Sequence, residues 1–173
     1  MAFSFYDEFT FVSLYTQGRS PLLQDRGAKK LVLARLLETK QRFRLHVAGY
    51  VLLDDHMHWL FSEPDGGEGS AIINFLRAGV QNDWRKLTPG REDAQVWEHG
   101  ARLQVVRGKA ELRHHMDFIH YDPVRHGLVE RATDYTWSSL PARVAEGYYP
   151  DDWAVEAPPA GVARVVRPVA EMQ

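Results

Sequence analysis

The sequence predicts an α+β domain, a ferredoxin-like antiparallel sheet with helices packed on one face. Its 173 residues, 45% hydrophobic and 25% charged, have the size and composition of one globular domain with a substantial core. Apolar residues recur with strand or helix periods in the order strand, helix, strand, strand, helix, strand, helix. The two middle strands are separated only by Asp54 and Asp55, a pair typical of tight turns, so they should form a hairpin.

The first strand is expected from Glu8 to Thr16, where apolar and hydroxyl residues alternate before Gly18. Asp25 can cap the helix that follows, from about Arg26 to Arg42, because its carboxylate can accept a hydrogen bond from a free backbone N–H. One face of this helix is apolar and the other charged. The apolar residues are Leu31, Ala34, Leu36 and Leu37, and the residues expected in solvent are Lys29, Lys30, Arg35, Glu38 and Lys40.

The hairpin and the second helix come next. Strands are expected over 45–53 and 56–62, followed by a Gly-rich acidic loop over 63–69. Ser70 can cap a helix from about Ala71 to Leu87, with a fourth strand around Arg102 to Arg107. The apolar stripe of that helix is Ile72, Phe75, Leu76, Val80 and Trp84.

The last long helix is expected from Lys109 to Tyr121. It should end by Asp122, because Pro123 has no N–H and disfavours the helical conformation of the residue before it. The domain is expected to span residues 1–153, and residues 154–173 should form a weakly ordered tail rich in Ala, Pro, Val and Gly.

Composition limits the kinds of site and location that the protein can have. There is no cysteine, so any metal must be held by histidine, carboxylate or amide side chains. No apolar run approaches the ~20 residues of a membrane span, and the N-terminus lacks the pattern of a signal peptide, so we expect a cytoplasmic protein. The formal net charge is −2, which argues against nucleic-acid binding unless positive charge is concentrated on one surface.

His56 and His58 begin the third strand with one residue between them. Alternate residues of a strand share a face, so the two imidazoles should point the same way from Cα atoms ~7 Å apart. They can then converge on one ion, while Met57 and Trp59 pack inward on the opposite face and the histidine face looks outward. The ordinary alternative is a pair of exposed histidines beside a turn. A metal site requires a third ligand from elsewhere in the chain.

Two stretches taken together resemble a known family. They are residues 53–60, Leu-Asp-Asp-His-Met-His-Trp-Leu, and residues 118–129, Phe-Ile-His-Tyr-Asp-Pro-Val-Arg-His-Gly-Leu-Val, with Trp137-Ser138-Ser139 downstream. They are similar to the REP-associated tyrosine transposases of the HUH single-tyrosine group, and the likeness covers roughly residues 8–153. The resemblance implies a monomer that binds single-stranded or hairpin DNA. It also implies a divalent metal, Mg²⁺ or Mn²⁺, on the His-x-His pair, and a tyrosine that forms a 5′-phosphotyrosine link.

The chain departs from the family pattern Tyr-Ile-His-x-Asn-Pro at two positions. Phe118 stands where the family has its nucleophilic tyrosine, so cleavage by the family mechanism is not expected of the chain as written. An engineered substitution and a natural loss of nicking both account for it. Asp122 stands in place of the asparagine that supplies the third metal ligand, and a carboxylate is a better ligand for Mg²⁺ or Mn²⁺ than an amide. An aspartate before proline is also a common turn residue.

Other residues have weaker assignments. Tyr121 lies one helical turn after position 118 and is either a substitute nucleophile or a packing or base-stacking residue. His120 should face away from the metal and be structural. The candidate DNA contacts, each of which has a surface salt bridge as its ordinary alternative, are Arg77, Arg85, Lys86, Arg102, Arg107, Arg113 and Arg125.

Two hypotheses from different classes therefore remain open. The first is a DNA nicking and joining enzyme with a metal at His56, His58 and Asp122 and a tyrosine nucleophile in the native chain. The second is a catalytically silent hairpin-DNA-binding protein on the same fold. A metallohydrolase is the least favoured hypothesis, because Asp54 and Asp55 are the only candidates for a general base.

Overall fold

The computed structural model describes residues 8–64, 69–91, 93–162 and 165 of the chain. Within these ranges, two short 3-10 helices, η1 and η2, accompany four strands and four α-helices. Their bounds are β1 Phe9–Tyr15, η1 Gln17–Arg19, α1 Arg26–Arg42, β2 His46–Leu52, β3 His56–Ser62, α2 Gly69–Leu87, β4 Arg102–Val106, α3 Lys109–Arg125, η2 Ala132–Asp134 and α4 Leu140–Ala145.

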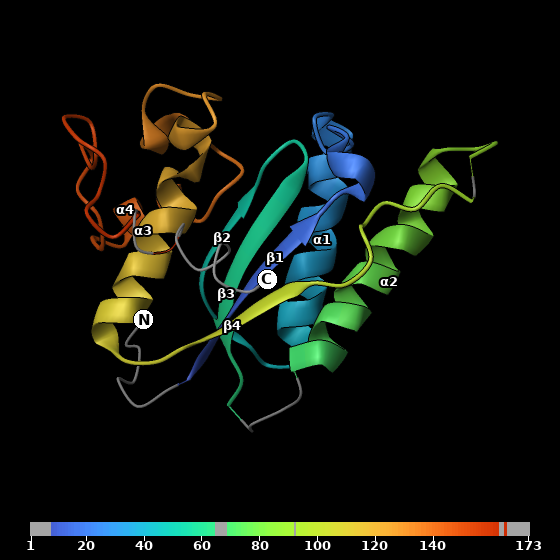
Figure 1. The fold of residues 1–173 in the computed structure, drawn as a ribbon, viewed down its shortest axis with the longest axis horizontal. Coiled ribbons are helices and arrows are strands. Elements are labelled where there is room, and N and C mark those ends of the chain that lie inside the picture. Colours follow the sequence, from blue (N-terminus) through green and yellow to red (C-terminus); the bar gives the residue numbers. More distant parts are fainter. Residues whose placement is uncertain (1–7, 65–68, 92, 163–164, 166–173) are drawn as a thin grey trace, which may run out of the picture.

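The strands form one antiparallel sheet in the order β2-β3-β1-β4 (Figure 1). The hairpin partners β2 and β3 lie side by side, β1 pairs with β3, and β4 pairs with β1 at the other edge. This order, with α1 and α2 as the crossover helices, is the ferredoxin-like topology. The predicted α+β class and the predicted hairpin are confirmed.

The helices lie on both faces of the sheet, which corrects the expectation of a single helical face. One core lies under α1 and α2 and includes Leu14, Trp59 and Leu76. A second core on the opposite face includes Leu60 and Phe118, and here α3 packs over β2 and β3 (Figure 1). Because the strands are apolar on both faces, the face that the two crossover helices leave open is the one α3 must cover.

Helix α1 begins and ends where predicted, and the Asp25 carboxylate accepts a hydrogen bond from the Ala28 N–H at 3.1 Å. Its buried face includes Lys29, which we expected in solvent. Lys29 Nζ donates to the Leu23 carbonyl at 2.8 Å and to Asp54 Oδ1 at 2.5 Å. These two bonds attach α1 to the turn between β2 and β3, so the charge is buried with its partners.

Helix α2 begins at Gly69, so Ser70 lies inside the helix rather than at its cap. Residues 65–68 of the predicted acidic loop lie outside the described residues. The predicted apolar stripe is buried at its centre, at Ile72, Leu76 and Val80, and partly buried at its two aromatic positions.

Helix α3 continues through Pro123 to Arg125, which corrects its predicted end at Asp122. The proline is two residues from the end, so the helix loses one hydrogen bond and regains others in its last turn. There the His126 N–H donates to the Asp122 carbonyl and the Leu128 N–H donates to the Pro123 carbonyl. The extra turn carries Arg125 and His126 over the sheet.

The segment after η2 lies along β2 and anchors α3. The Leu52 N–H donates to the Trp137 carbonyl at 2.9 Å, and the Tyr50 N–H donates to Ser139 Oγ at 2.9 Å. Ser139 Oγ also bonds His120 Nε2 at 2.7 Å. The Trp-Ser-Ser motif thus fixes α3 on the sheet through His120.

The predicted tail, residues 154–173, falls partly outside the described residues. In its described part, Val162 and Val165 are buried against the second core. Among the helices of the described residues, none has the length and apolar character needed to cross a membrane.

Removing the buried amine of α1 tests its role in the fold. Lys29→Ala should lower the free energy of unfolding by about 2–4 kcal/mol, because the Leu23 carbonyl and the Asp54 carboxylate lose their buried partner. Lys30→Ala, at the exposed neighbouring position, should change it by less than about 0.5 kcal/mol. Urea denaturation of the two variants measures the difference, and equal midpoints would show that the Lys29 contacts do not stabilise the fold.

Candidate metal centre

His56 and His58 lie on the face of β3 that α3 covers. Their side chains are buried, so the expectation that this face looks outward into solvent is wrong. The period of the strand does hold, because Met57 and Trp59 point into the opposite core. The two imidazole rings lie edge to face with their centroids 5.0 Å apart.

Each histidine has a hydrogen-bond partner at its Nδ1 atom. His56 Nδ1 lies 2.6 Å from Asp55 Oδ1, and since a carboxylate only accepts, the imidazole donates. His58 Nδ1 lies 2.8 Å from the hydroxyl of Ser13, which faces it from β1. Such partners orient a metal-binding imidazole and leave its Nε2 atom for the ion.

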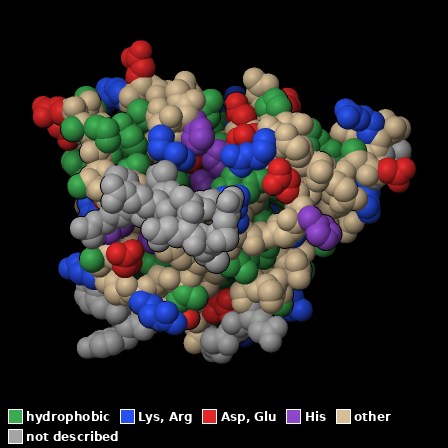
Figure 2. Space-filling model, in the orientation of Figure 1, with side chains coloured by type: hydrophobic (Ala, Val, Ile, Leu, Met, Phe, Trp, Pro, Cys, Tyr) green, Lys and Arg blue, Asp and Glu red, His purple; other side chains and the backbone are tan. Residues whose placement is uncertain are grey.

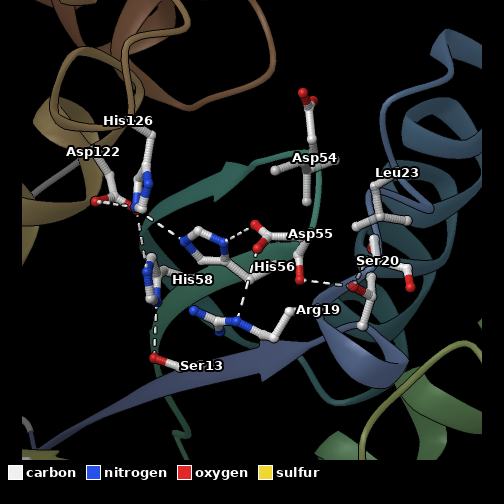
Figure 3. Close-up of polar contacts among 12 residues, drawn as sticks. Ser13, Arg19, Ser20, Leu23, Asp54, Asp55, His56, His58, Asp122 and His126 are labelled. Atoms are coloured by element: carbon white, nitrogen blue, oxygen red, sulfur yellow. Dashed lines mark hydrogen bonds and ion pairs between the residues drawn. The ribbon is translucent and has the colours of Figure 1, made fainter.

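Asp122 approaches the same point from α3 (Figure 3). Its Oδ2 atom lies 3.2 Å from His56 Nε2 and 3.2 Å from His58 Nε2. The carboxylate is fully buried, and its other oxygen, Oδ1, accepts a hydrogen bond from Arg125 Nε at 2.7 Å and forms an ion pair with Arg125 Nη2 at 2.6 Å. The structure therefore brings together the three residues that were predicted as metal ligands, from positions 66 residues apart in the chain.

The charges at this point favour a carboxylate facing a neutral imidazole. Burial alone would raise the pKa of Asp122, but the two imidazoles and the Arg125 guanidinium outweigh burial and hold that pKa well below its usual range. Burial lowers the pKa of His58, and the neighbouring Asp122 offsets this only in part. His58 is therefore neutral near pH 7, the state in which it can bind a metal.

The donor set fits a divalent cation. His56 Nδ1 already donates a hydrogen bond to Asp55, so Nε2 is the ring nitrogen that faces Asp122 Oδ2, at 3.2 Å. A lone pair on Nε2 and a carboxylate oxygen would both be acceptors at this distance, so the contact requires a proton or a metal ion between them. The ligand atoms of His56, His58 and Asp122 all lie within 4.8 Å of one another. This buried cluster can hold a divalent metal ion.

Phe118 lies beside the cluster, one helical turn before Asp122. Its ring is 5.2 Å from the His58 ring and 6.1 Å from the Phe11 ring, measured between centroids. The Arg125 guanidinium lies 5.0 Å from the centre of the Phe118 ring. The position assigned to the nucleophile by resemblance is thus adjacent to the candidate metal ligands, although phenylalanine brings no oxygen to it.

Tyr121 and His120 point away from the cluster. The Tyr121 ring packs edge to face against Trp153, with centroids 6.4 Å apart. His120 is buried beside Tyr149, and burial together with the charges of Arg143 and Arg113 lowers its pKa to about 3. The neutral His120 has the structural role expected for it, and Tyr121 is placed for packing.

The candidate DNA contacts separate into two groups. Arg125 touches Asp122, and Arg102 lies beside Tyr15, which stacks on His56. The others lie away from the cluster, either on α2, which covers the opposite face, or near the other ends of β4 and α3. Their contacts are Arg77 with the Glu98 carbonyl, Lys86 with Asp83, Arg107 with Glu8 and Arg113 with Asp117, while Arg85 lies near the end of α2.

Sequence reasoning missed two residues that lie beside the three clustered side chains. His126 lies 4.9 Å from the His56 ring, and its Nε2 is 3.5 Å from Asp122 Oδ1 (Figure 3). His126 follows Asp122 by four residues, so the two share a helix face. The sequence prediction missed this because it ended the helix at the proline. Ser13 has no signal in the sequence, because only strand pairing places it opposite His58.

Positive charge gathers around this cluster even though the net charge of the chain is −2. Arg125 contacts Asp122, and Arg19 and Arg102 lie over Tyr15 beside His56. Figure 2 shows Lys and Arg side chains on both sides of exposed histidine atoms near the top of this face. The objection to nucleic-acid binding from net charge therefore does not apply to this surface.

The partner of His56 Nδ1 provides a test of the metal centre. Asp55→Asn should weaken Mn²⁺ binding about 10- to 100-fold, because the imidazole loses the carboxylate that orients it and raises its basicity. Asp151→Asn, an exposed carboxylate elsewhere, should leave the affinity unchanged. Calorimetric titration measures both, and equal affinities would contradict the orienting role of Asp55.

The sequence of this chain is similar to those of known proteins. No family model matches the chain. A REP-associated tyrosine transposase of Escherichia coli (strain K12) is 29% identical over 126 residues, which cover 69% of this chain and 68% of that protein. A Haemophilus influenzae relative with the same family designation is 27% identical over 124 residues, 67% and 70% of the two chains.

Solved structures give the same result for the fold. A REP-associated tyrosine transposase bound to a REP hairpin matches with a TM-score of 0.73 and 23% sequence identity, over 89% of this chain and 90% of that one. The predicted resemblance is confirmed: the chain is similar to the REP-associated tyrosine transposases in sequence and has the fold of one of them.

Proposed function

We propose that this chain is a transposase-like protein that binds hairpin DNA with adjoining single strand and holds a divalent metal at His56, His58 and Asp122. The observation that carries the proposal is the approach of both Nε2 atoms to one oxygen of Asp122, each at 3.2 Å. The similar solved protein was bound to a REP hairpin, which supports the choice of ligand. The arginines beside the cluster supply positive charge for a phosphate backbone.

The metal would be Mg²⁺ or Mn²⁺. The carboxylate suits both ions, and the two imidazoles favour Mn²⁺ of the two. Bound there, the ion would withdraw charge from the oxygens of a phosphodiester. Asp55 and Ser13 would hold the imidazoles in place, and Arg125, already hydrogen-bonded to Asp122 and 34% exposed, could also bind a phosphate oxygen.

The chain as it stands would bind DNA without cleaving it by the tyrosine mechanism. In that mechanism a phenolic oxygen attacks the phosphorus, the bond from phosphorus to the 3′ oxygen breaks, and the strand is left as a 5′-phosphotyrosine with a free 3′-hydroxyl. Phe118 supplies a ring at the right place but no oxygen. A tyrosine at position 118 would put a hydroxyl beside the ligands, since the ring already lies 5.2 Å from the His58 ring.

A catalytically silent DNA-binding protein is thus the form of the proposal that applies to the present chain, and the nicking enzyme applies to a chain with tyrosine at position 118. The silent form is favoured by the packing of Phe118, which is 5% exposed and contacts two other aromatic rings. An apolar ring is stable there without any partner for a hydroxyl.

Restoring the nucleophile tests the proposal. The Phe118→Tyr variant, incubated with Mn²⁺ and a labelled DNA hairpin carrying single-stranded extensions, should form a covalent protein–DNA adduct in a denaturing gel. The unmodified chain should bind the same DNA in a native gel and form no adduct. Binding by neither protein at low salt would overturn the proposal.

Two further variants assign the adduct to the proposed site. Adding His58→Ala to Phe118→Tyr should abolish the adduct, because a metal ligand is lost. Adding Tyr121→Phe should leave it unchanged, because Tyr121 packs against Trp153. An adduct formed by the unmodified chain and lost on Tyr121→Phe would instead make Tyr121 the nucleophile.

A further inference from the structure

Two arginines bracket one tyrosine at the end of β1, next to the metal ligands. The Arg19 guanidinium lies 3.8 Å from the centre of the Tyr15 ring, and the Arg102 guanidinium lies 5.0 Å from it. Tyr15 stacks on His56 with ring centroids 5.6 Å apart and planes inclined by 29°. The two positive charges are therefore one aromatic ring away from a metal ligand.

The backbone after β1 is shaped to hold Arg19 over that ring. Gly18 has φ of 62° and Arg19 has φ of 55°, two successive residues in the left-handed region. Glycine adopts this conformation readily, but arginine does so only where its surroundings stabilise it. The contact with Tyr15 supplies such stabilisation, since a guanidinium over an aromatic face is attracted by the ring.

The two guanidinium groups have little neutralising charge around them. Within the described part of the chain, Arg102 has no carboxylate within 4 Å, and Arg19 has Asp55 at 3.7 Å, a carboxylate already bonded to His56. Both arginines are exposed, Arg19 by 49% of its side chain. They are positioned by Tyr15 but still free to donate hydrogen bonds to an anion.

We propose that Arg19 and Arg102, held by Tyr15, bind a phosphate of the single strand next to the phosphate at the metal cluster. This subsite rests on the proposed function and deepens it. Guanidinium groups recognise phosphate oxygens through paired N–H donors, and groups held in place beforehand lose less entropy on binding. Arg125 lies on the other side of the cluster, on α3, so the strand would pass between Arg125 and the pair formed by Arg19 and Arg102.

The geometry favours a phosphate over a base as the occupant. Arg19 lies over the Tyr15 ring, and His56 is stacked against the same ring, so a base would have to displace a guanidinium or a metal ligand to stack there. The arginine side chains, in contrast, need no rearrangement to reach a backbone oxygen. The subsite would therefore bind the strand without distinguishing its base sequence.

Binding measurements with Arg102→Gln test the subsite. Arg102 is the cleaner of the two, because Arg19 also contacts Asp55. The probe is a labelled DNA hairpin with a single-stranded extension, measured by fluorescence anisotropy over a series of salt concentrations with Mn²⁺ present. The variant should bind about tenfold more weakly, as expected for one lost charge-assisted contact. The slope of log affinity against log salt should fall by about 0.7.

Controls separate this subsite from general electrostatics and from the metal. Arg42→Gln removes an exposed arginine at the end of α1, on the opposite face, and should leave both affinity and slope unchanged. Arg102→Gln should keep the Mn²⁺ affinity of the unmodified chain and should bind a blunt hairpin normally. Tyr15→Leu should weaken binding to the extended hairpin by a similar factor although no charge is lost.

The outcomes distinguish failure of the subsite from failure of the proposed function. Equal binding by Arg102→Gln and Arg42→Gln, with normal hairpin binding by the unmodified chain, would overturn the subsite alone. No hairpin binding by the unmodified chain would overturn both. An extension made of abasic nucleotides should preserve the effect of Arg102→Gln, and disappearance of the effect would show that the arginine contacts a base instead.

Discussion

The contact of one buried carboxylate with two imidazoles organises this face of the molecule. Asp122 belongs to α3, and His56 and His58 belong to β3, so the cluster joins a helix and a sheet that are far apart in the chain. A charge in this position is stable only with hydrogen bonds or a cation around it. Arg125 covers one carboxylate oxygen, and the imidazoles surround the other. The same geometry that satisfies Asp122 brings together three side chains that could hold a metal ion.

The turn between β2 and β3 connects this cluster to the rest of the fold. Its two aspartates have different roles: Asp54 bonds Lys29 of α1 on one side, and Asp55 bonds His56 on the other. One turn therefore fixes the position of the hairpin against α1 and the orientation of a candidate metal ligand. The backbone supports it as well, since the Thr16 N–H donates to the Asp55 carbonyl at 2.9 Å. Precise placement of the imidazole thus depends on packing some distance from the cluster.

Local sequence signals were sufficient for most of the elements. Periodicity and the Asp25 cap placed α1 at its observed bounds, and the strand period placed His56 and His58 on one face. The motif resemblance selected Asp122 as the third ligand. The same rules failed at Pro123. The rule that proline ends a helix does not consider that a proline close to the helix end removes only one hydrogen bond, which the packing of the last turn can offset. That error hid His126.

The sequence by itself determined the order of the elements, the ferredoxin-like class and the pairing of two histidines, because these follow from periods of two and 3.6 residues and from turn chemistry. Only the tertiary structure decided that α3 lies on the face opposite α1 and α2, that Lys29 is buried, and that Arg19 and Arg102 meet over Tyr15. Such contacts join residues distant in the chain. They depend on which apolar face remains to be covered and on which strands pair, and neither is encoded in a local pattern.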